Sequence, residues 1–347
     1  MRHLFTPFSQ FLVLAAVFLL PAALPAQQAD TSFGPLPVFE LHSGFWMNLH
    51  HTLYFQAREK RDKRTGGANS STTPRLSEAE RRDWDAAVAY YAANFANKDL
   101  LFSTELVLLK NQLGDFEDCD ELSGARKKTC DAGLPGNTAQ VLDSAAPIYR
   151  AHWWPEHDRA NRRWIAGVAP LVRNKGLDLA QRLAEIYQTK WPLEKIRVDV
   201  TAYANWAGAY TTLDPLRVTI SSTDLGNQGS VALEVLFHEA SHGIAEPVQA
   251  AIIRECRQRD KPIPRDLWHA LIFYTTGEVV RPVIMNSAGA GGNGGAPSAD
   301  YTPYAVREGL YRRGWDEYLK LLNRFWQPYL DNKVTFDDAI ARMVSAQ

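Results

Sequence analysis

The sequence predicts a predominantly helical α+β protein that contains one small β-sheet. Amphipathic segments with apolar residues at helical spacing run through residues 45–190. Three short β-branched or aromatic segments follow within residues 196–222, and helical patterns return from residue 230 onward. With 347 residues, 46% of them hydrophobic and 22% charged, the chain can bury a large core.

The first 26 residues have the features of an export signal. Arg2 and His3 precede the apolar run 11–20, and small residues lead to Ala26. This run of about ten residues is shorter than the ~20 that a membrane span needs, so we predict cleavage after Ala26. The sequence thus predicts a periplasmic or secreted protein with no stable membrane span after signal removal, and residues 27–347 are expected to form a single catalytic domain.

The amino-terminal part of this domain, residues 45–190, is expected to be helical, and the proline- and glycine-rich residues 27–44 are expected to lie over the surface. The first helix is predicted at residues 45–63. Another helix should follow Ser77, because Ser77 and Glu80 have the spacing of a capping box. Further helices are predicted at about 100–113, 138–150, 157–173 and 177–190.

Residues 196–285 are predicted to hold the sheet and two apolar helices. Strands are expected in "IRVDVTAYA", "WAGAYTT" and "LRVTISS", which polar or proline-containing turns separate. One helix should start after Ser230, which can cap it, and stop at Pro247, and a second should span residues 267–280. We expect the sheet to pack on the first of these helices, and residues 217–222 to offer a strand edge to an extended peptide.

The carboxy-terminal part begins with a glycine-rich segment, residues 286–300, which is either a lid or a plain surface loop. Helices are then expected within residues 303–345, at about 303–325 and 335–345.

Three cysteines follow the export signal. In an oxidising compartment Cys119 and Cys130 are the natural disulfide pair, because only a short polar segment separates them. Cys256 is then left as a half-buried free thiol, since no activating motif surrounds it.

The segment "FHEASH", residues 237–242, places two histidines and a glutamate within an apolar run. His238 and His242 are four residues apart, so on a helix they share one face, about 6 Å apart along the axis, and can bind one zinc ion. Glu239 can reach a water on the metal and accept its proton. Unpaired polar groups in such a run would be costly, which favours a metal site over simple packing. Glu234, one turn earlier, is expected to orient a ligand.

A catalytic zinc ion needs a third protein ligand. The second apolar helix offers Glu278 and His269, which are nine residues apart and therefore on opposite faces of a regular helix. Over residues 230–280 the chain resembles the gluzincin metallopeptidases, in which a helix bearing a glutamate ligand follows the His-Glu helix, and the resemblance implies a zincin-like domain. It also implies three zinc ligands and one general base, namely His238, His242, Glu278 and Glu239. His269 is the alternative third ligand.

A tetrahedral oxyanion formed during hydrolysis also requires a donor near the metal. The candidates are His269, Tyr274, Tyr304 and Arg307. We retain His269 and Tyr304 as catalytic candidates. His50 and His51 form a second pair, but adjacent residues on a helix point apart, so no metal site is expected there.

The sequence therefore predicts a hydrolase that uses one Zn²⁺ ion and attacks an amide carbonyl of a peptide or protein substrate. Hydrolysis of another amide, such as one in cell-wall material, would use the same chemistry. The alternative class is a non-catalytic exported protein with a ligand-binding role or a structural zinc site, which both His269 and Glu278 could close. A net charge of -1 and the lack of a long basic run argue against nucleic-acid binding.

Overall fold

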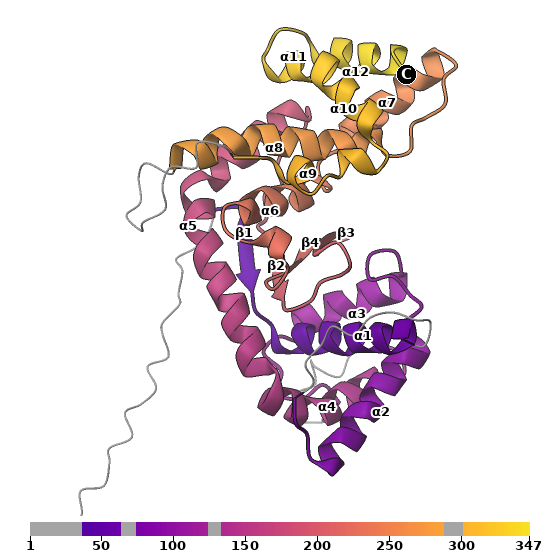
Figure 1. Ribbon diagram of the computed structural model, residues 1–347, viewed down its shortest axis with the longest axis vertical. Helices are drawn as coiled ribbons and strands as arrows, with labels where there is room; N and C mark the ends of the chain where they lie inside the picture. Colours follow the sequence, from indigo (N-terminus) through magenta and orange to yellow (C-terminus); the bar gives the residue numbers. More distant parts are fainter. Residues whose placement is uncertain (1–36, 64–73, 124–132, 288–300) are drawn as a thin grey trace, which may run out of the picture. The chain divides into compact units, whose positions relative to one another are not determined.

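Four short strands form one mixed sheet in the order β1-β2-β4-β3. In the computed structural model, which describes residues 37–63, 74–123, 133–287 and 301–347, β1 pairs parallel with β2, β2 parallel with β4, and β3 antiparallel with β4 (Figure 1). The strands are β1 (Phe39–His42), β2 (Ile196–Thr201), β3 (Ala209–Leu213) and β4 (Leu216–Ser221).

The sheet confirms the three predicted strands and corrects two other expectations. Residues 27–44 were expected to lie over the surface, yet Phe39 is fully buried and lies in β1. Residues 217–222 were expected to offer a strand edge, but β4 is hydrogen-bonded to a strand on each side and has no free edge. The edge strands are β1 and β3, and the first four residues of β3 are each at most 5% exposed.

Five helices precede the second strand, and they confirm the helical amino-terminal part. They are α1 (Phe45–Lys63), α2 (Glu78–Asn94), α3 (Thr104–Asp115), α4 (Thr138–His152) and α5 (Trp154–Ile186). The predicted capping box opens α2, because the Glu80 N–H donates to Ser77 Oγ at 3.3 Å and the Ser77 N–H donates to Glu80 Oε2 at 2.8 Å.

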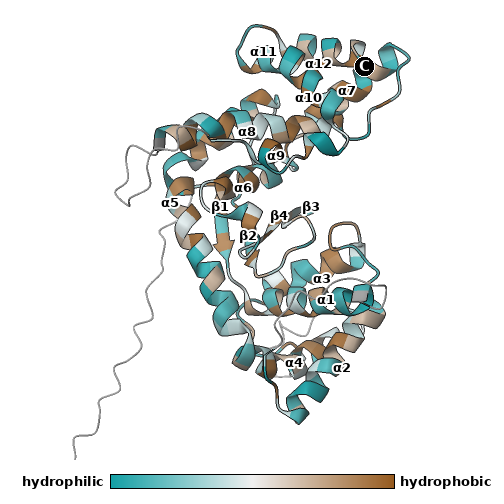
Figure 2. Ribbon diagram, viewed as in Figure 1, coloured by the Kyte–Doolittle hydropathy of each residue, from teal (hydrophilic) through white to brown (hydrophobic). Residues whose placement is uncertain are grey.

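The two helices expected at about 157–173 and 177–190 are a single helix, α5, because the intervening "NKG" does not interrupt the helical backbone. Figure 2 shows hydrophilic and hydrophobic residues alternating along α5. This pattern fits its position, since one face of the helix contacts β2, α6 and α8. Helices α1 to α4 enclose an aromatic-rich core that includes Trp46, Tyr91 and Tyr149, each at most 1% exposed.

After the sheet, the turn η1 (Leu225–Asn227) leads to α6 (Val231–Ser241), which is followed by α7 (Glu246–Gln258) and α8 (Leu267–Ser287). The predicted boundary at Pro247 was wrong, because α6 ends at Ser241 and Pro247 lies in the first turn of α7, where its missing N–H costs nothing. Ser230 makes no side-chain capping bond. Helix α6 lies against β3, β4, α5 and α8, which confirms that the sheet packs on the His-Glu helix.

The carboxy-terminal region consists of short helical segments, where the sequence predicted one helix at about 303–325. They are α9 (Tyr304–Arg307), η2 (Tyr311–Arg313), α10 (Asp316–Leu321), η3 (Leu322–Trp326), α11 (Gln327–Leu330) and α12 (Phe336–Ser345). Gly314, with φ of 118°, interrupts the expected helix, since such a backbone conformation favours glycine.

Residues Pro35–Gln347 form one compact unit by their contacts. Within the described ranges, no helix combines the length and the apolar composition of a membrane span. The export signal and the glycine-rich segment 288–300 lie outside the described residues, as does Cys130, the expected partner of Cys119. Cys256 is a free thiol as expected, but it is fully buried rather than half-buried.

Candidate metal centre

Helix α6 carries the His-Glu motif through the interior of the protein. All eleven of its residues are buried, which agrees with its composition of mostly Val, Ala, Leu and Phe. His238 lies in the last turn of α6. His242 is the first residue after the end of this helix and keeps helical backbone angles (φ -56°, ψ -32°). The four-residue spacing therefore keeps both imidazoles on one face, with ring centroids 5.1 Å apart.

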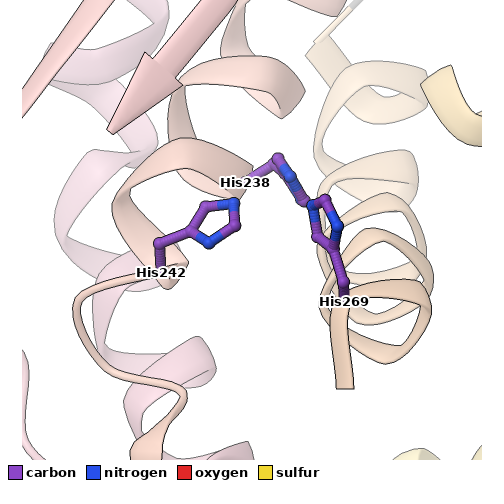
Figure 3. A group of neighbouring side chains, drawn as sticks. All are labelled: His238, His242 and His269. Carbon is purple, nitrogen blue, oxygen red and sulfur yellow. The ribbon is translucent and has the colours of Figure 1, made fainter. Parts of the chain in front are cut away.

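The structure adds His269 of α8 to this pair. Its ring centroid lies 5.4 Å from that of His238 and 5.0 Å from that of His242. One nitrogen from each of the three rings lies within 4.8 Å of the others (Figure 3). Zinc-bound nitrogens stand about 3.3 Å apart when each lies ~2.0 to 2.1 Å from the ion. Small rotations of the rings would therefore bring all three onto one ion, so this group could hold a metal.

Burial makes these histidines suitable ligands. It lowers the pKa of His238 well below its usual value, that of His242 to about 3 and that of His269 to about 4. All three rings are therefore neutral at physiological pH and offer free lone pairs, the form that binds metals. In addition, Nδ1 of His238 is buried without a hydrogen-bond partner among the described residues. A metal ion would satisfy the polar atoms that the protein leaves unpaired here.

Glu278, the favoured third ligand in the sequence analysis, does not lie with the two histidines of α6. Its carboxylate pairs with the guanidinium of Arg281 one turn further along α8. Nine residues separate it from His269, which corresponds to half a revolution at 100° per residue, so the two side chains leave α8 on opposite faces. The structure thus brings together His238, His242 and His269. Because Glu278 lies on the opposite face of α8, the structure does not support a closed site that includes both His269 and Glu278.

Two candidate oxyanion donors are occupied elsewhere. Tyr274 shares the face of Glu278, and its hydroxyl lies 2.7 Å from Gln327 Oε1 and 2.9 Å from Asn323 Oδ1. Arg307 donates to the backbone carbonyl of Gly226 at 2.9 Å. Through these contacts, Tyr274 and Arg307 fasten carboxy-terminal segments to the rest of the protein, which is a structural role.

Tyr304 lies near the histidines, although it does not contact them through a hydrogen bond. Its ring is nearly parallel to that of Phe273 at 6.0 Å, and Phe273 stacks on His238 with ring centroids 3.5 Å apart. Burial raises the pKa of Tyr304 to about 12, and the charges of Glu308, Asp224 and Glu239 add to the rise. The phenol is therefore protonated at neutral pH and can donate a hydrogen bond.

Glu234 holds this tyrosine in place rather than orienting a histidine, as the sequence suggested. Its carboxylate accepts the backbone N–H of Tyr304 at 2.9 Å and the hydroxyl of Tyr301. Gly277 allows this approach, because a Cβ there would lie 2.7 Å from Pro303 and 3.2 Å from Glu234 Oε1. Glu234 thus ties the segment around α9 to the His-Glu helix.

Glu239 follows His238 in α6 and is buried, with 8% of its surface exposed. Burial raises the pKa of its carboxyl group to about 7, whereas a hydrogen bond from Thr211 opposes the rise. The Thr211 hydroxyl lies 2.6 Å from Glu239 Oε2. A carboxyl group with a pKa close to neutrality, next to a metal site, is suited to general acid-base work.

Aromatic rings enclose the remaining sides of the three histidines. Trp268 stacks on His269 at 5.2 Å, and Trp315 meets the same ring edge-on at 5.4 Å. Together with Phe273, these rings limit the contact of the site with bulk water, while His242 and His269 stay partly exposed. A lower local dielectric strengthens each charge interaction in it.

His50 and His51 belong to no group of three potential metal ligands among the described residues. His51 bonds Met47 O at 2.9 Å and the Tyr210 hydroxyl at 3.0 Å, while His50 bonds the Tyr91 hydroxyl at 3.0 Å. Both are therefore core histidines with hydrogen-bond partners.

Comparison with known proteins adds no assignment, because no family model, curated protein or solved structure matches the chain.

The sequence analysis missed Thr211 and Phe273. Alternation along β3 could have placed Thr211 on one face of the sheet, but no sequence signal indicates which helix that face meets. Phe273 is four residues from His269 and therefore shares its face of α8. This spacing becomes informative only once the structure shows that His269 faces His238 and His242.

Proposed function

We propose that the protein is a zinc-dependent hydrolase in which His238, His242 and His269 hold one ion and Glu239 is the general base. The observation that carries this proposal is the meeting of three neutral histidines from two helices beside a buried glutamate. Three nitrogen ligands leave a fourth position for water, as catalytic zinc sites require, whereas structural sites are closed by four protein ligands.

A zinc ion in this position would polarise a water molecule and the carbonyl group of the substrate. Glu239, next to His238 in α6, would accept the proton of the attacking water and pass it to the leaving amine. The protonated Tyr304 phenol, held by Glu234, is the best-placed candidate to donate to the developing oxyanion.

Peptides and proteins are the proposed substrates, in line with the gluzincin resemblance of residues 230–280. In the proposed site, His269 takes the place of the glutamate that gluzincins use as the third zinc ligand. The export-signal pattern of residues 1–26 supports a proposed location in the periplasm or outside the cell.

Zinc analysis and a peptidase assay test this function together. Purified protein should contain about one zinc per chain. The Glu239→Gln variant should keep its zinc yet lose cleavage of a peptide library, because the amide cannot accept the proton. Retained cleavage in this variant would contradict the proposal, and cleavage of cell-wall fragments but not peptides would reassign the substrate.

A further inference from the structure

We propose that Thr211 is a positioning residue that holds the Glu239 carboxylate in the orientation needed for proton transfer. This inference rests on the proposed function, because it concerns the general base of that reaction. Thr211 lies in the middle of the edge strand β3 and is 5% exposed. Its Oγ1 lies 2.6 Å from Glu239 Oε2 and 2.8 Å from the backbone carbonyl oxygen of the same residue.

The two contacts fix the glutamate at both ends of its side chain. A free glutamate side chain rotates about three bonds, and a general base is effective only when one of its oxygens faces the proton that it accepts. The carbonyl oxygen belongs to the rigid backbone of α6, so its distance to Thr211 Oγ1 fixes the hydroxyl relative to the helix. The hydroxyl then fixes Oε2, and Oε1 is left to face the reaction.

The hydroxyl also suits a base that changes its charge during turnover. It has one hydrogen and two neighbouring acceptors, so rotation about the Cβ–Oγ1 bond can direct that hydrogen to either oxygen. It therefore keeps contact with Glu239 whichever group holds the proton.

The strand that carries Thr211 is held from its opposite face. Side chains alternate along a strand, so Tyr210 and Thr212 point away from α6. The Tyr210 hydroxyl lies 3.0 Å from His51 Nε2 on α1, and the buried Lys110 of α3 donates to Thr212 Oγ1 at 2.6 Å. Thr211 is thus flanked by two anchored residues, and a precise position of this kind is what a group that supports a catalytic base requires.

Four variants separate the hydroxyl from the packing of the side chain. Thr211→Val keeps the shape and removes the hydroxyl, whereas Thr211→Ser keeps the hydroxyl. Thr211→Ala differs from Thr211→Ser by the hydroxyl alone. If Thr211→Val does not fold, the comparison of these two variants therefore shows whether the hydroxyl is required. Thr219→Val is the matched control, because Thr219 is fully buried in β4 and lies opposite Tyr210, on the face away from Glu239.

The probe is acetohydroxamic acid bound to the cobalt(II)-substituted full-length protein. A hydroxamic acid binds a metal through two oxygens, and its acidic proton needs a neighbouring base. The visible spectrum of cobalt therefore reports binding without any assumption about the substrate. Glu239→Gln serves as the reference variant that has lost the base.

We expect the dissociation constant of acetohydroxamate to rise about tenfold in Thr211→Val and Thr211→Ala, because the carboxyl group that takes up the hydroxamate proton is then no longer held in the orientation that this transfer needs. The Thr211→Ser and Thr219→Val variants should bind like the unmodified protein. Equal binding by Thr211→Val and the unmodified protein, with weaker binding by Glu239→Gln, would overturn the role of Thr211 and leave the proposed function intact. Equal weakening in the serine and alanine variants would also overturn it, because packing would then be the cause.

Two other outcomes would concern the proposed function itself. If cobalt does not bind, or if acetohydroxamate leaves its spectrum unchanged in the unmodified protein, the open metal site is wrong. If Glu239→Gln binds acetohydroxamate as tightly as the unmodified protein, Glu239 is not the base. In each of these cases the role of Thr211 is overturned as well, because it depends on both.

Discussion

The carboxylate of Glu234 accepts a hydrogen bond from the backbone N–H of Tyr304, with Oε1 2.9 Å from the nitrogen. This bond joins the His-Glu helix to a segment 70 residues further along the chain. Glu234, one turn before His238, therefore supports the candidate metal site by holding the segment around Tyr304, and not by contacting the histidines.

The burial of Glu234 predicts a pH dependence of stability. Burial raises the pKa of its carboxyl group from 4.5 to about 7, although Arg307 and Arg281 oppose the rise. Because the pKa in the folded state is above that in the unfolded state, the contribution of this group is fully present below pH 4.5. It falls as the pH rises towards 7 and is absent above that. The total loss is about 3 kcal/mol.

Urea unfolding of metal-free protein between pH 4 and pH 8 checks this dependence. Glu234→Gln removes the ionisation, and its amide oxygen can still accept the Tyr304 N–H. The stability of the unmodified protein should therefore fall relative to that of the variant as the pH rises. A constant difference between the two proteins across this range would contradict the assignment.

The choice of third ligand predicts opposite results for two residues of α8. His269→Ala should lower zinc affinity by more than ~100-fold, since loss of a ligand costs at least as much as loss of a group that orients one. Glu278→Ala should leave the affinity unchanged, because its carboxylate pairs with Arg281. Competition titration with a chromogenic chelator measures both constants. Loss of zinc in the Glu278 variant alone would restore the glutamate as the ligand.

Zinc should stabilise the folded protein, because the three ligands meet only in that state. Free zinc at about 100 times its dissociation constant would add about 2.7 kcal/mol, equivalent to roughly 5 °C in Tm. Differential scanning calorimetry with and without EDTA measures the shift. The His242→Ala variant should show none, and an equal shift in it would place the zinc elsewhere.

The buried Lys110 predicts a cost that is separate from metal binding. Its amino group is fully buried and donates to Thr212 Oγ1, and burial lowers its pKa to about 7. Lys110→Met should lower the free energy of unfolding by about 1 kcal/mol, since it removes this hydrogen bond, whereas the nearby Asp199 keeps its ion pair with Arg197. Lys320→Met, at an exposed ion pair, should leave the stability nearly unchanged. A stability unchanged by Lys110→Met in urea unfolding would contradict a contribution from this hydrogen bond.

Local patterns were enough to predict the elements that depend on neighbouring residues. The bounds of α1 follow from apolar spacing, and the start of α2 follows from Ser77 and Glu80, because a cap is a contact within one turn. The pairing of His238 with His242 is of the same kind, since helical geometry alone puts residues four apart on one face.

Strand β1 and the single helix α5 could not be predicted in this way. Four residues of β1 become a strand because β2, more than 150 residues later, supplies their hydrogen-bond partners. The strand order likewise places β4 inside the sheet and β3 at its edge, although both carry similar β-branched sequences.

The sequence by itself determined that His238 and His242 lie on one face, because this depends only on the pitch of a helix. Only the tertiary structure brings His269, and not Glu278, to these two histidines, since both residues lie in α8 and the packing of α8 on α6 selects which face meets the histidines. It also decided that Thr211 meets Glu239. Contacts between elements that are distant along the chain arise from how their surfaces pack, and no local pattern encodes that choice.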